Sequence, residues 1–122
     1  MSKRVLVVDD DRAATGVLSR LLTKLGYEVR EENNAVKAVE AAREFQPGVV
    51  ILDFLMPEVH GGEIAWQLAQ DPALEKTPGL ILCSGVPIAY LEQKLPPVRI
   101  NVIEKPVDFG ALVVALYEAR AA

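Results

Sequence analysis

Short, continuous apolar runs alternate along the chain with segments in which apolar residues recur every three or four positions. The first run, residues 4–8, is rich in β-branched side chains and predicts a buried strand. The segment after it, residues 11–25, predicts a helix, and Gly26 stands where such a helix ends. The apolar face of this helix comprises Ala14, Val17, Leu18, Leu21, Leu22 and Leu25.

The same alternation continues to the end of the chain. It predicts strands at 27–30, 49–53, 80–83 and 98–103, and helices from Asn33 or Asn34 to Phe45, over 61–70, over 88–95 and over 107–120. In the last helix, Leu112, Val113 and Leu116 are expected to face the core. Five strand–helix units of this kind predict an α/β protein with a flavodoxin-like (βα)5 fold. Its five-stranded parallel sheet has the order 2-1-3-4-5 and carries helices on both faces.

Composition narrows the functional classes. The 122 residues suit one hydrophobic core, so residues 1–122 are expected to form a single domain, with no output domain in this chain. No apolar run approaches the roughly 18 residues of a membrane span, and three aspartates follow the first strand where a secretory signal would stay apolar. A cytoplasmic protein is therefore expected. The net charge of −4 does not indicate a surface that binds nucleic acid. The lone Cys83 is expected to be an inert core residue.

Polar residues gather where the predicted strands end. Asp9, Asp10 and Asp11 follow the first strand, Asp53 ends the third, Ser84 the fourth, and Lys105 the fifth. Because ligands of such sheets bind beyond the carboxyl ends of the strands, these side chains are expected to converge. Close carboxylates repel one another unless a cation lies among them, and an oxygen-only donor set suits Mg²⁺ or Mn²⁺. A carboxylate nucleophile, a metal and a lysine together indicate phosphoryl transfer.

Taken singly, each of these residues has a simpler explanation. Asp11 is better explained as the N-cap of the first helix than as part of a site. Asp53 could cap a turn before Pro57, Ser84 could bond its own backbone, and a lone lysine such as Lys105 is usually a solvated charge. Their occurrence together at the ends of four strands is what favours a site.

Four sequence pieces, VLVVDDD, VVILDFLMPEVHGG, LILCSG and IEKP, resemble in order and spacing the receiver domains of two-component signalling, including the chemotaxis regulators. The similarity covers essentially the whole chain. The resemblance implies that Asp53 accepts the phosphoryl group and that Mg²⁺ or Mn²⁺ is the cofactor. It also implies that Asp10 binds the metal directly, Asp9 mainly through water, and Leu55 through its backbone carbonyl, with Asp53 completing the set.

The resemblance also assigns the residues that sense the phosphoryl group. Lys105 would pair with it, Ser84 would be the switch hydroxyl with the Gly85 amide beside it, and the bond before Pro106 would be a candidate for the cis form. Two features depart from the family. Val102 stands where an aromatic residue is usual, and the segment before the fifth strand is short and contains Pro96-Pro97. Both departures concern the output mechanism rather than the chemistry.

The implied partners are a sensor histidine kinase or phosphotransfer protein as donor and a downstream protein target that the sequence does not identify. Direct binding to nucleic acid or membrane is not expected, and a weak homodimer through the fourth helix, fifth strand and fifth helix is compatible with the family. Such a domain catalyses only its own phosphorylation and dephosphorylation. Three alternatives remain: a haloacid-dehalogenase-type phosphatase built on Asp9-x-Asp11, a flavin or nucleotide carrier, and a receiver-like docking module that is not phosphorylated.

Overall fold

A five-stranded parallel sheet forms the centre of the protein, and its order, β2-β1-β3-β4-β5, confirms the prediction. The computed structural model describes residues 3–121. The strands are β1 (Arg4–Val8), β2 (Glu28–Glu32), β3 (Val49–Asp53), β4 (Gly79–Ser84) and β5 (Asn101–Glu104). The helical elements are α1 (Arg12–Lys24), the 3₁₀ turn η1 (Ala35–Lys37), α2 (Ala38–Phe45), α3 (Gly61–Gln70), α4 (Ile88–Glu92) and α5 (Phe109–Ala121).

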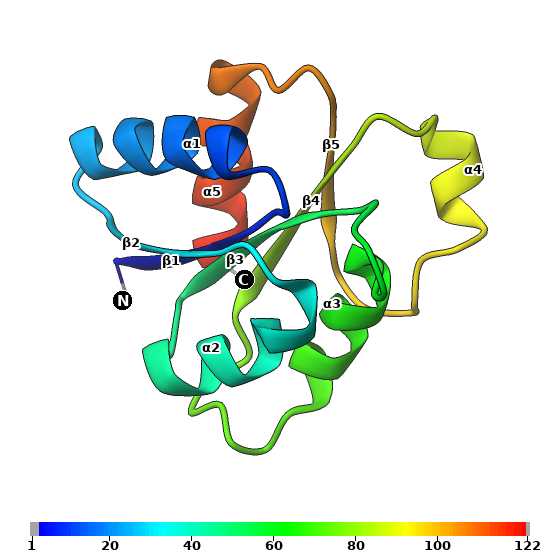
Figure 1. Ribbon diagram of the computed structural model, residues 1–122, viewed down its shortest axis with the longest axis horizontal. Coiled ribbons are helices and arrows are strands. Elements are labelled where there is room, and N and C mark those ends of the chain that lie inside the picture. The colour runs from blue at the N-terminus through cyan, green and yellow to red at the C-terminus, as the bar shows by residue number, and fades with distance from the viewer. Residues whose placement is uncertain (1–2, 122) are drawn as a thin grey trace.

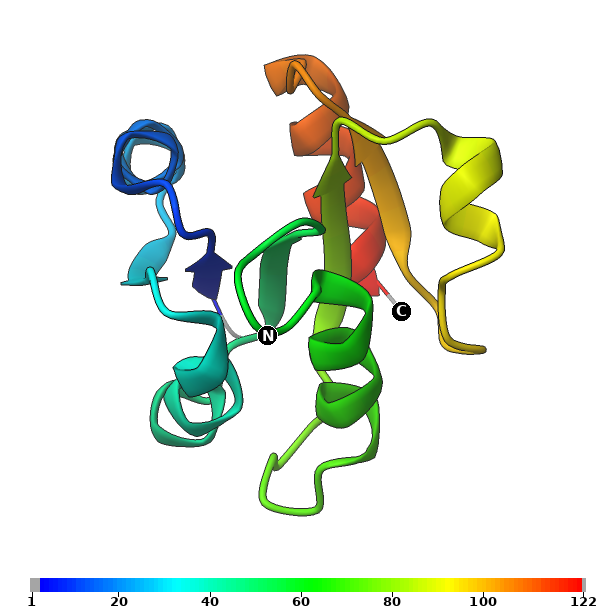
Figure 2. The same cartoon turned by 45° about the vertical axis from the view of Figure 1, so that its right-hand side comes forward.

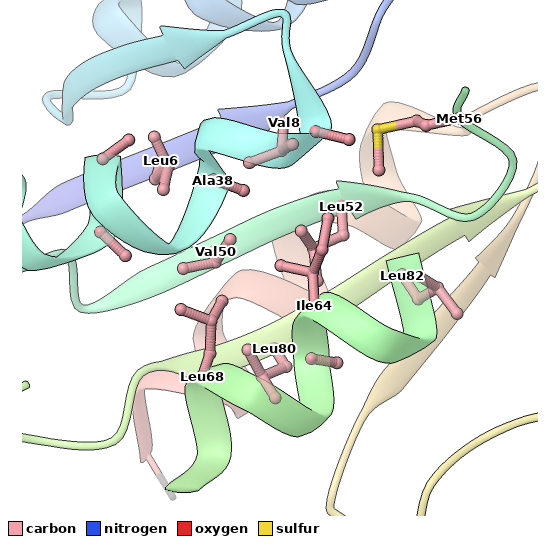
Figure 3. Packing of buried hydrophobic residues seen from close by; sticks show 14 of the residues in the cluster. Leu6, Val8, Ala38, Val50, Leu52, Met56, Ile64, Leu68, Leu80 and Leu82 are labelled. Atoms are coloured by element: carbon pink, nitrogen blue, oxygen red, sulfur yellow. The ribbon is translucent and has the colours of Figure 1, made fainter. Parts of the chain in front are cut away.

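Helices cover both faces of the sheet, and Figure 1 shows α1 and α2 on opposite sides of the strands. Successive side chains of a strand point to opposite faces of the sheet. The apolar side chains of the strands therefore form two separate clusters, one under the helices on each face. Leu6, Val50 and Leu52 pack with α2 and α3 in one cluster, part of which is drawn in Figure 3. Val5 and Ile51 pack with α1 and α5 in the other.

The central strands are buried on both faces, which is why their sequences are continuous runs of apolar residues. All five residues of β3 are buried, and each fully buried Leu, Ile or Val stabilises the fold by about 1.5–3 kcal/mol. By contrast, β2 lies at the edge of the sheet, pairs only with β1 and carries the polar sequence EVREE. None of the helices in residues 3–121 has the length and apolar character needed to cross a membrane.

The largest departures from the predicted elements flank α4. The predicted strand 98–103 is observed at Asn101–Glu104, because pairing with β4 begins only at Ile81↔Asn101. The apolar side chains of Val98 and Ile100 pack from a loop instead, which their pattern could not distinguish from a strand. The helix predicted at 88–95 ends at Glu92, after which the Gln93 and Lys94 amides bond carbonyls three residues back. Figure 2 shows this short helix at the right, on the outer side of β5.

Helix orientation differed from the prediction at a few apolar positions. Val113 was expected in the core but is 44% exposed, whereas Leu112 and Leu116 are buried as expected. On α1, Val17 is 54% exposed and Leu18 is buried. Periodicity could not fix the inner face of α5, because its sequence, FGALVVALYEARA, is apolar on nearly every side.

Close packing between β4 and α5 makes Gly79 a sensitive position. A Cβ atom there would lie 2.6 Å from the Ala119 carbonyl oxygen and 2.7 Å from the Ala119 Cβ atom. We predict that Gly79→Ala lowers the free energy of unfolding by about 1–3 kcal/mol, because the added methyl overpacks this contact. Urea denaturation measures it. Gly16→Ala is the matched control, since nothing lies near its Cβ position in α1, and it should raise stability by about 0.5–1 kcal/mol. Equal effects of the two changes would contradict this account.

Candidate functional site

Three carboxylates meet at the carboxyl ends of β1 and β3. The register pairs Val8 with Leu52, so the next residues, Asp9 and Asp53, lie side by side. Asp9 and Asp53 are 6% and 8% exposed, whereas Asp10 is exposed. One carboxylate oxygen from each of the three lies within 4.8 Å of the other two. The fold therefore brings together the three acidic residues that the sequence proposed for a metal.

Asp11, although adjacent in sequence, serves the helix. Its Oδ1 atom accepts hydrogen bonds from the Ala13 and Ala14 amides at 2.9 and 3.3 Å. This is N-cap geometry at the start of α1, and it confirms the sequence interpretation of Asp11. The Asp9 side chain, in turn, accepts from the Asp11 amide at 3.0 Å, which orients it within the cluster.

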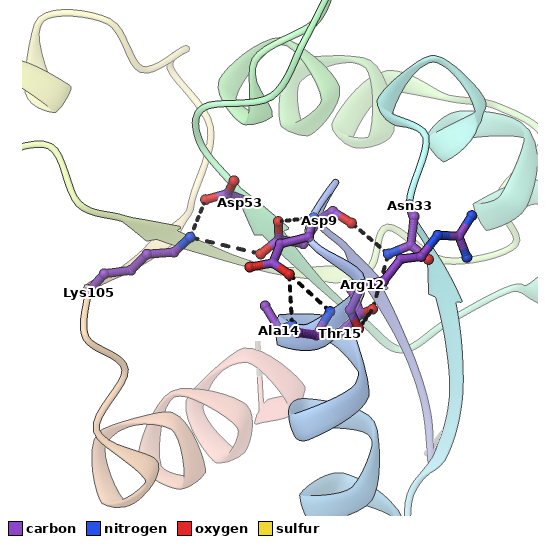
Figure 4. A network of polar contacts seen from close by, with 9 residues as sticks. Asp9, Arg12, Ala14, Thr15, Asn33, Asp53 and Lys105 are labelled. Atoms are coloured by element: carbon purple, nitrogen blue, oxygen red, sulfur yellow. Dashed lines mark hydrogen bonds and ion pairs between the residues drawn. The ribbon is translucent and has the colours of Figure 1, made fainter.

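Lys105 supplies the positive charge of the site (Figure 4). Its Nζ atom lies 2.7 Å from Asp53 Oδ1 and 3.8 Å from Asp9 Oδ2. Partial burial lowers the pKa of Lys105, but the hydrogen bond and charge of Asp53 outweigh that effect and raise the pKa above its usual value. The ammonium group therefore stays charged and bridges the two buried carboxylates, rather than pointing into solvent.

One lysine does not neutralise the cluster. Burial raises the pKa of Asp9 to about 6, and the charge of Asp53 adds to this, although the Asp11 amide and Lys105 act in the opposite direction. A carboxylate that is costly to ionise beside two others is the expected environment for a cation. The donors at this cluster are all carboxylate oxygens, which fit a hard ion such as Mg²⁺ or Mn²⁺.

The loop after β3 is held by backbone bonds close to Asp53. The Phe54 amide donates to Cys83 O at 3.0 Å, and the Gly61 amide donates to Phe54 O at 2.8 Å. A Cβ atom at Gly61 would collide with the Asp53 carbonyl, so glycine lets α3 begin directly against the end of β3. Leu55, whose carbonyl the resemblance assigned to the metal, lies in this loop and is 63% exposed.

Ser84 is the last residue of β4, directly after the Cys83 that pairs with Asp53, and Gly85 follows it. The Ser84 hydroxyl is buried and accepts from the Val86 amide at 2.9 Å, which is the local backbone bond considered as the simpler explanation. Gly85 is exposed and has no neighbouring atoms around its Cβ position. The Lys105–Pro106 peptide bond is cis, at the position that the resemblance marked as a candidate.

Val102 lies on β5 and is half-buried. It lines a groove of about 670 Å³ between α4, β5 and α5, away from the carboxylates. The groove also contains the acidic side chains of Glu104, Asp108 and Glu118. Thus no aromatic ring occupies this position on β5, and the face formed by α4, β5 and α5 is hollow and acidic.

Cys83 is a core residue, as expected. It is 4% exposed, and burial raises the pKa of its thiol to about 11. It also lines a pocket of about 260 Å³ between α1 and α5, whose mainly apolar wall includes Val17 and Phe109 and whose rim includes Asp53 and Lys105. Sequence reasoning missed this pocket, because residues from both ends of the chain form it.

Sequence reasoning also missed Asn33 and Thr15. Asn33 was considered only as a helix cap, but Asn34 caps η1 by accepting from the Val36 amide. The Asn33 side chain instead contacts the Asp9 carbonyl and the Thr15 hydroxyl. The only sequence signal was the pair of asparagines, of which a single helix start needs one.

Comparison with known proteins identifies the family. The family model described as "Response regulator receiver domain" matches residues 5–117. The "Chemotaxis protein CheY" of Thermotoga maritima is 36% identical over 87 residues, covering 70% of this chain and 70% of that protein. "Response regulator MprA" of Mycobacterium ulcerans is 43% identical over 68 residues, which are 56% of this chain but only 29% of MprA.

Solved structures agree with the sequence relatives. The signal receiver domain of a response regulator from Bermanella marisrubri superposes with a TM-score of 0.82 at 30% identity, and the match covers 98% of both chains. The receiver domain of the hybrid histidine kinase CckA has a TM-score of 0.76 at 25% identity and covers 96% of this chain and 98% of that one. This chain therefore belongs to the response regulator receiver domains of two-component signalling.

Proposed function

We propose that this domain accepts a phosphoryl group on Asp53 from the phosphohistidine of a sensor histidine kinase or phosphotransfer protein, in a reaction that requires Mg²⁺ or Mn²⁺. The observation that carries the proposal is the contact of Lys105 with Asp53 at 2.7 Å, inside a cluster of three carboxylates. A nucleophile, a phosphate-pairing cation and a set of metal ligands thereby share one edge of the sheet. The phosphatase and carrier alternatives are dropped, because the chain belongs to a different family.

The proposed step follows from this geometry. An Asp53 carboxylate oxygen attacks phosphorus and forms an O–P bond, while the P–N bond to the donor imidazole breaks and its electron pair stays on that nitrogen. Lys105 shifts from the Asp53 carboxylate to an oxygen of the arriving phosphoryl group. Asp9, Asp10, Asp53 and the Leu55 carbonyl would hold the metal, which neutralises charge on the transferred group. We propose that the reaction takes place in the cytoplasm.

The readout is proposed to begin at Ser84. Its hydroxyl turns from the Val86 backbone toward a phosphoryl oxygen, with the exposed Gly85 amide beside it. The opened turn would lead directly into α4, a helix of five residues. The partner is proposed to bind at the acidic groove of α4, β5 and α5, where a downstream protein or a weakly associating second copy would cover it.

Our first functional prediction concerns the phosphoacceptor. Incubation with acetyl phosphate and Mg²⁺ should add one phosphoryl group to the wild-type protein, detected by intact-mass analysis, and Asp53→Asn should abolish the addition. Asp11→Asn is the matched control, because it also removes a carboxylate near the site but preserves the cap of α1. Full labelling of Asp53→Asn, or labelling unaffected by a chelator, would refute the proposed function and favour a docking module that is not phosphorylated.

The second prediction concerns the metal. Mg²⁺ should raise the melting temperature, because it binds the native state and relieves carboxylate repulsion. A tenfold excess over its Kd stabilises by about 1.4 kcal/mol, or roughly 3–6 °C for a domain of this size. Asp10→Ala should remove most of the rise, and Asp11→Asn should retain it. If calorimetry at pH 8 finds the same rise in both variants, Asp10 is not a ligand.

The third prediction concerns the output. Val102 is small and stiff, so it cannot act as a two-position aromatic switch. Hydrogen exchange with and without beryllium fluoride plus Mg²⁺ should therefore show altered protection in residues 85–97 and little change around Val102. A large change centred on β5 would show that the signal passes through that strand without an aromatic residue.

A further inference from the structure

A side chain outside the acidic cluster holds the backbone from which the cluster projects. Asn33 follows β2, and its Nδ2 atom donates to the Asp9 carbonyl at 2.8 Å and to Thr15 Oγ1 at 3.0 Å (Figure 4). The Thr15 hydroxyl, which is fully buried, donates in turn to the Arg12 carbonyl at 3.1 Å. This chain of hydrogen bonds joins the end of β2, the acidic loop after β1 and the first turn of α1.

The position of the Asp9 carbonyl matters because it belongs to the peptide unit that joins Asp9 to Asp10. Fixing its direction fixes the plane from which the Asp10 backbone departs. The amide of Asp9 is held as well, since it donates to the Glu32 carbonyl at 3.2 Å. Two adjacent residues at the end of β2 therefore hold the backbone of Asp9. The Glu32 carbonyl accepts from the Asp9 amide, and the Asn33 side chain donates to the Asp9 carbonyl.

This restraint acts against a real opposing force. Carboxylates of Asp9, Asp10 and Asp53 lie within 4.8 Å of one another, and their repulsion favours a loop that turns Asp10 away. A single hydrogen bond between neutral groups contributes little net stability, so a restraint built from two linked bonds is harder to open than one bond alone. The Asn33 Nδ2 atom bonds both the Asp9 carbonyl and Thr15 Oγ1, so turning the loop away would break a bond that Thr15 holds in place.

We propose that Asn33 is a positioning residue for the divalent cation, acting through the Asp9 carbonyl, with Thr15 fixing the Asn33 amide. The inference rests on the proposed function only in taking Asp9, Asp10 and Asp53 as the cation site. Groups that orient metal ligands typically contribute 10–100-fold in affinity. Asn33 orients the backbone between two ligands rather than a ligand atom itself, so the lower part of that range applies.

The test is Mn²⁺ affinity, measured by electron paramagnetic resonance of the free ion. Asn33→Leu, similar in size but without a donor, should raise the Kd about 5–20-fold. Asn34→Leu is the matched control: it removes the cap of η1 and should leave the Kd within about twofold of wild type, because Asn34 touches no ligand. Thr15→Val keeps the bond from Asn33 to Asp9 and should have a smaller effect, which should not add to that of Asn33→Leu.

Two further readouts separate positioning from a general loss of stability. Phosphorylation by acetyl phosphate should need more Mn²⁺ in Asn33→Leu but reach nearly the wild-type rate at saturation. By reciprocity, Mn²⁺ should slow hydrogen exchange of residues 32–36 in the wild type and not in Asn33→Leu. Should Asn33→Leu fail to fold, Thr15→Val carries the same comparisons with smaller shifts.

The proposal is overturned if Asn33→Leu melts at a lower temperature yet binds Mn²⁺ as tightly as wild type, or if Asn34→Leu weakens Mn²⁺ binding equally. It also fails if the wild-type protein binds no Mn²⁺. Failure of the proposed function looks different: Mn²⁺ would bind and respond to Asn33→Leu, but acetyl phosphate would label Asp53→Asn as fully as wild type.

Discussion

The repulsion among three carboxylates at the ends of β1 and β3 is the constraint on which the site depends. Asp9 and Asp53 are buried side by side, and a buried charge is costly unless it is paired. Lys105 bridges them from the loop after β5, so it ties the last strand to the two central ones. The remaining excess of negative charge is what a divalent cation would balance. The proposed phosphoryl transfer to Asp53 relies on this charge pattern.

The rest of the fold keeps these charged side chains close together. Parallel strands end at one edge, so the residues just after β1, β3 and β5 meet there without any of them being close in sequence. The apolar clusters on the two faces fix the register of the strands, and a slip of one residue would turn Asp53 and its neighbours to the opposite face. Asn33 and Gly61 then refine the positions of the two acidic loops from outside the cluster.

The face around α4 is built differently from the carboxylate cluster. Asp9 and Asp53 are buried and bonded to Lys105, whereas α4 is one short helix between loops, and the groove beside it is open and acidic. With Val102 in place of an aromatic ring, the proposed signal from Ser84 would have its shortest route along the backbone into α4. The proposed chemistry and the proposed readout would then depend on separate parts of the sheet edge, joined by the single turn after β4.

The sequence by itself determined the fold class, the strand order and the family, because buried parallel strands leave continuous apolar runs and the polar motifs stand at their ends. It also identified Asp53, Asp10 and Lys105 as candidates, since residue type and position after a strand suffice for that. It could not decide between local and long-range partners: Asp11 caps a helix, whereas Lys105 reaches two other strands. Where apolar residues lie on nearly every side of a helix, as on α5, or in a loop, as Val98 does, their spacing does not show which side chains face the core. Only the tertiary structure could show Asn33 against Asp9, because that contact joins residues 24 positions apart whose meeting depends on the pairing of β1 with β2.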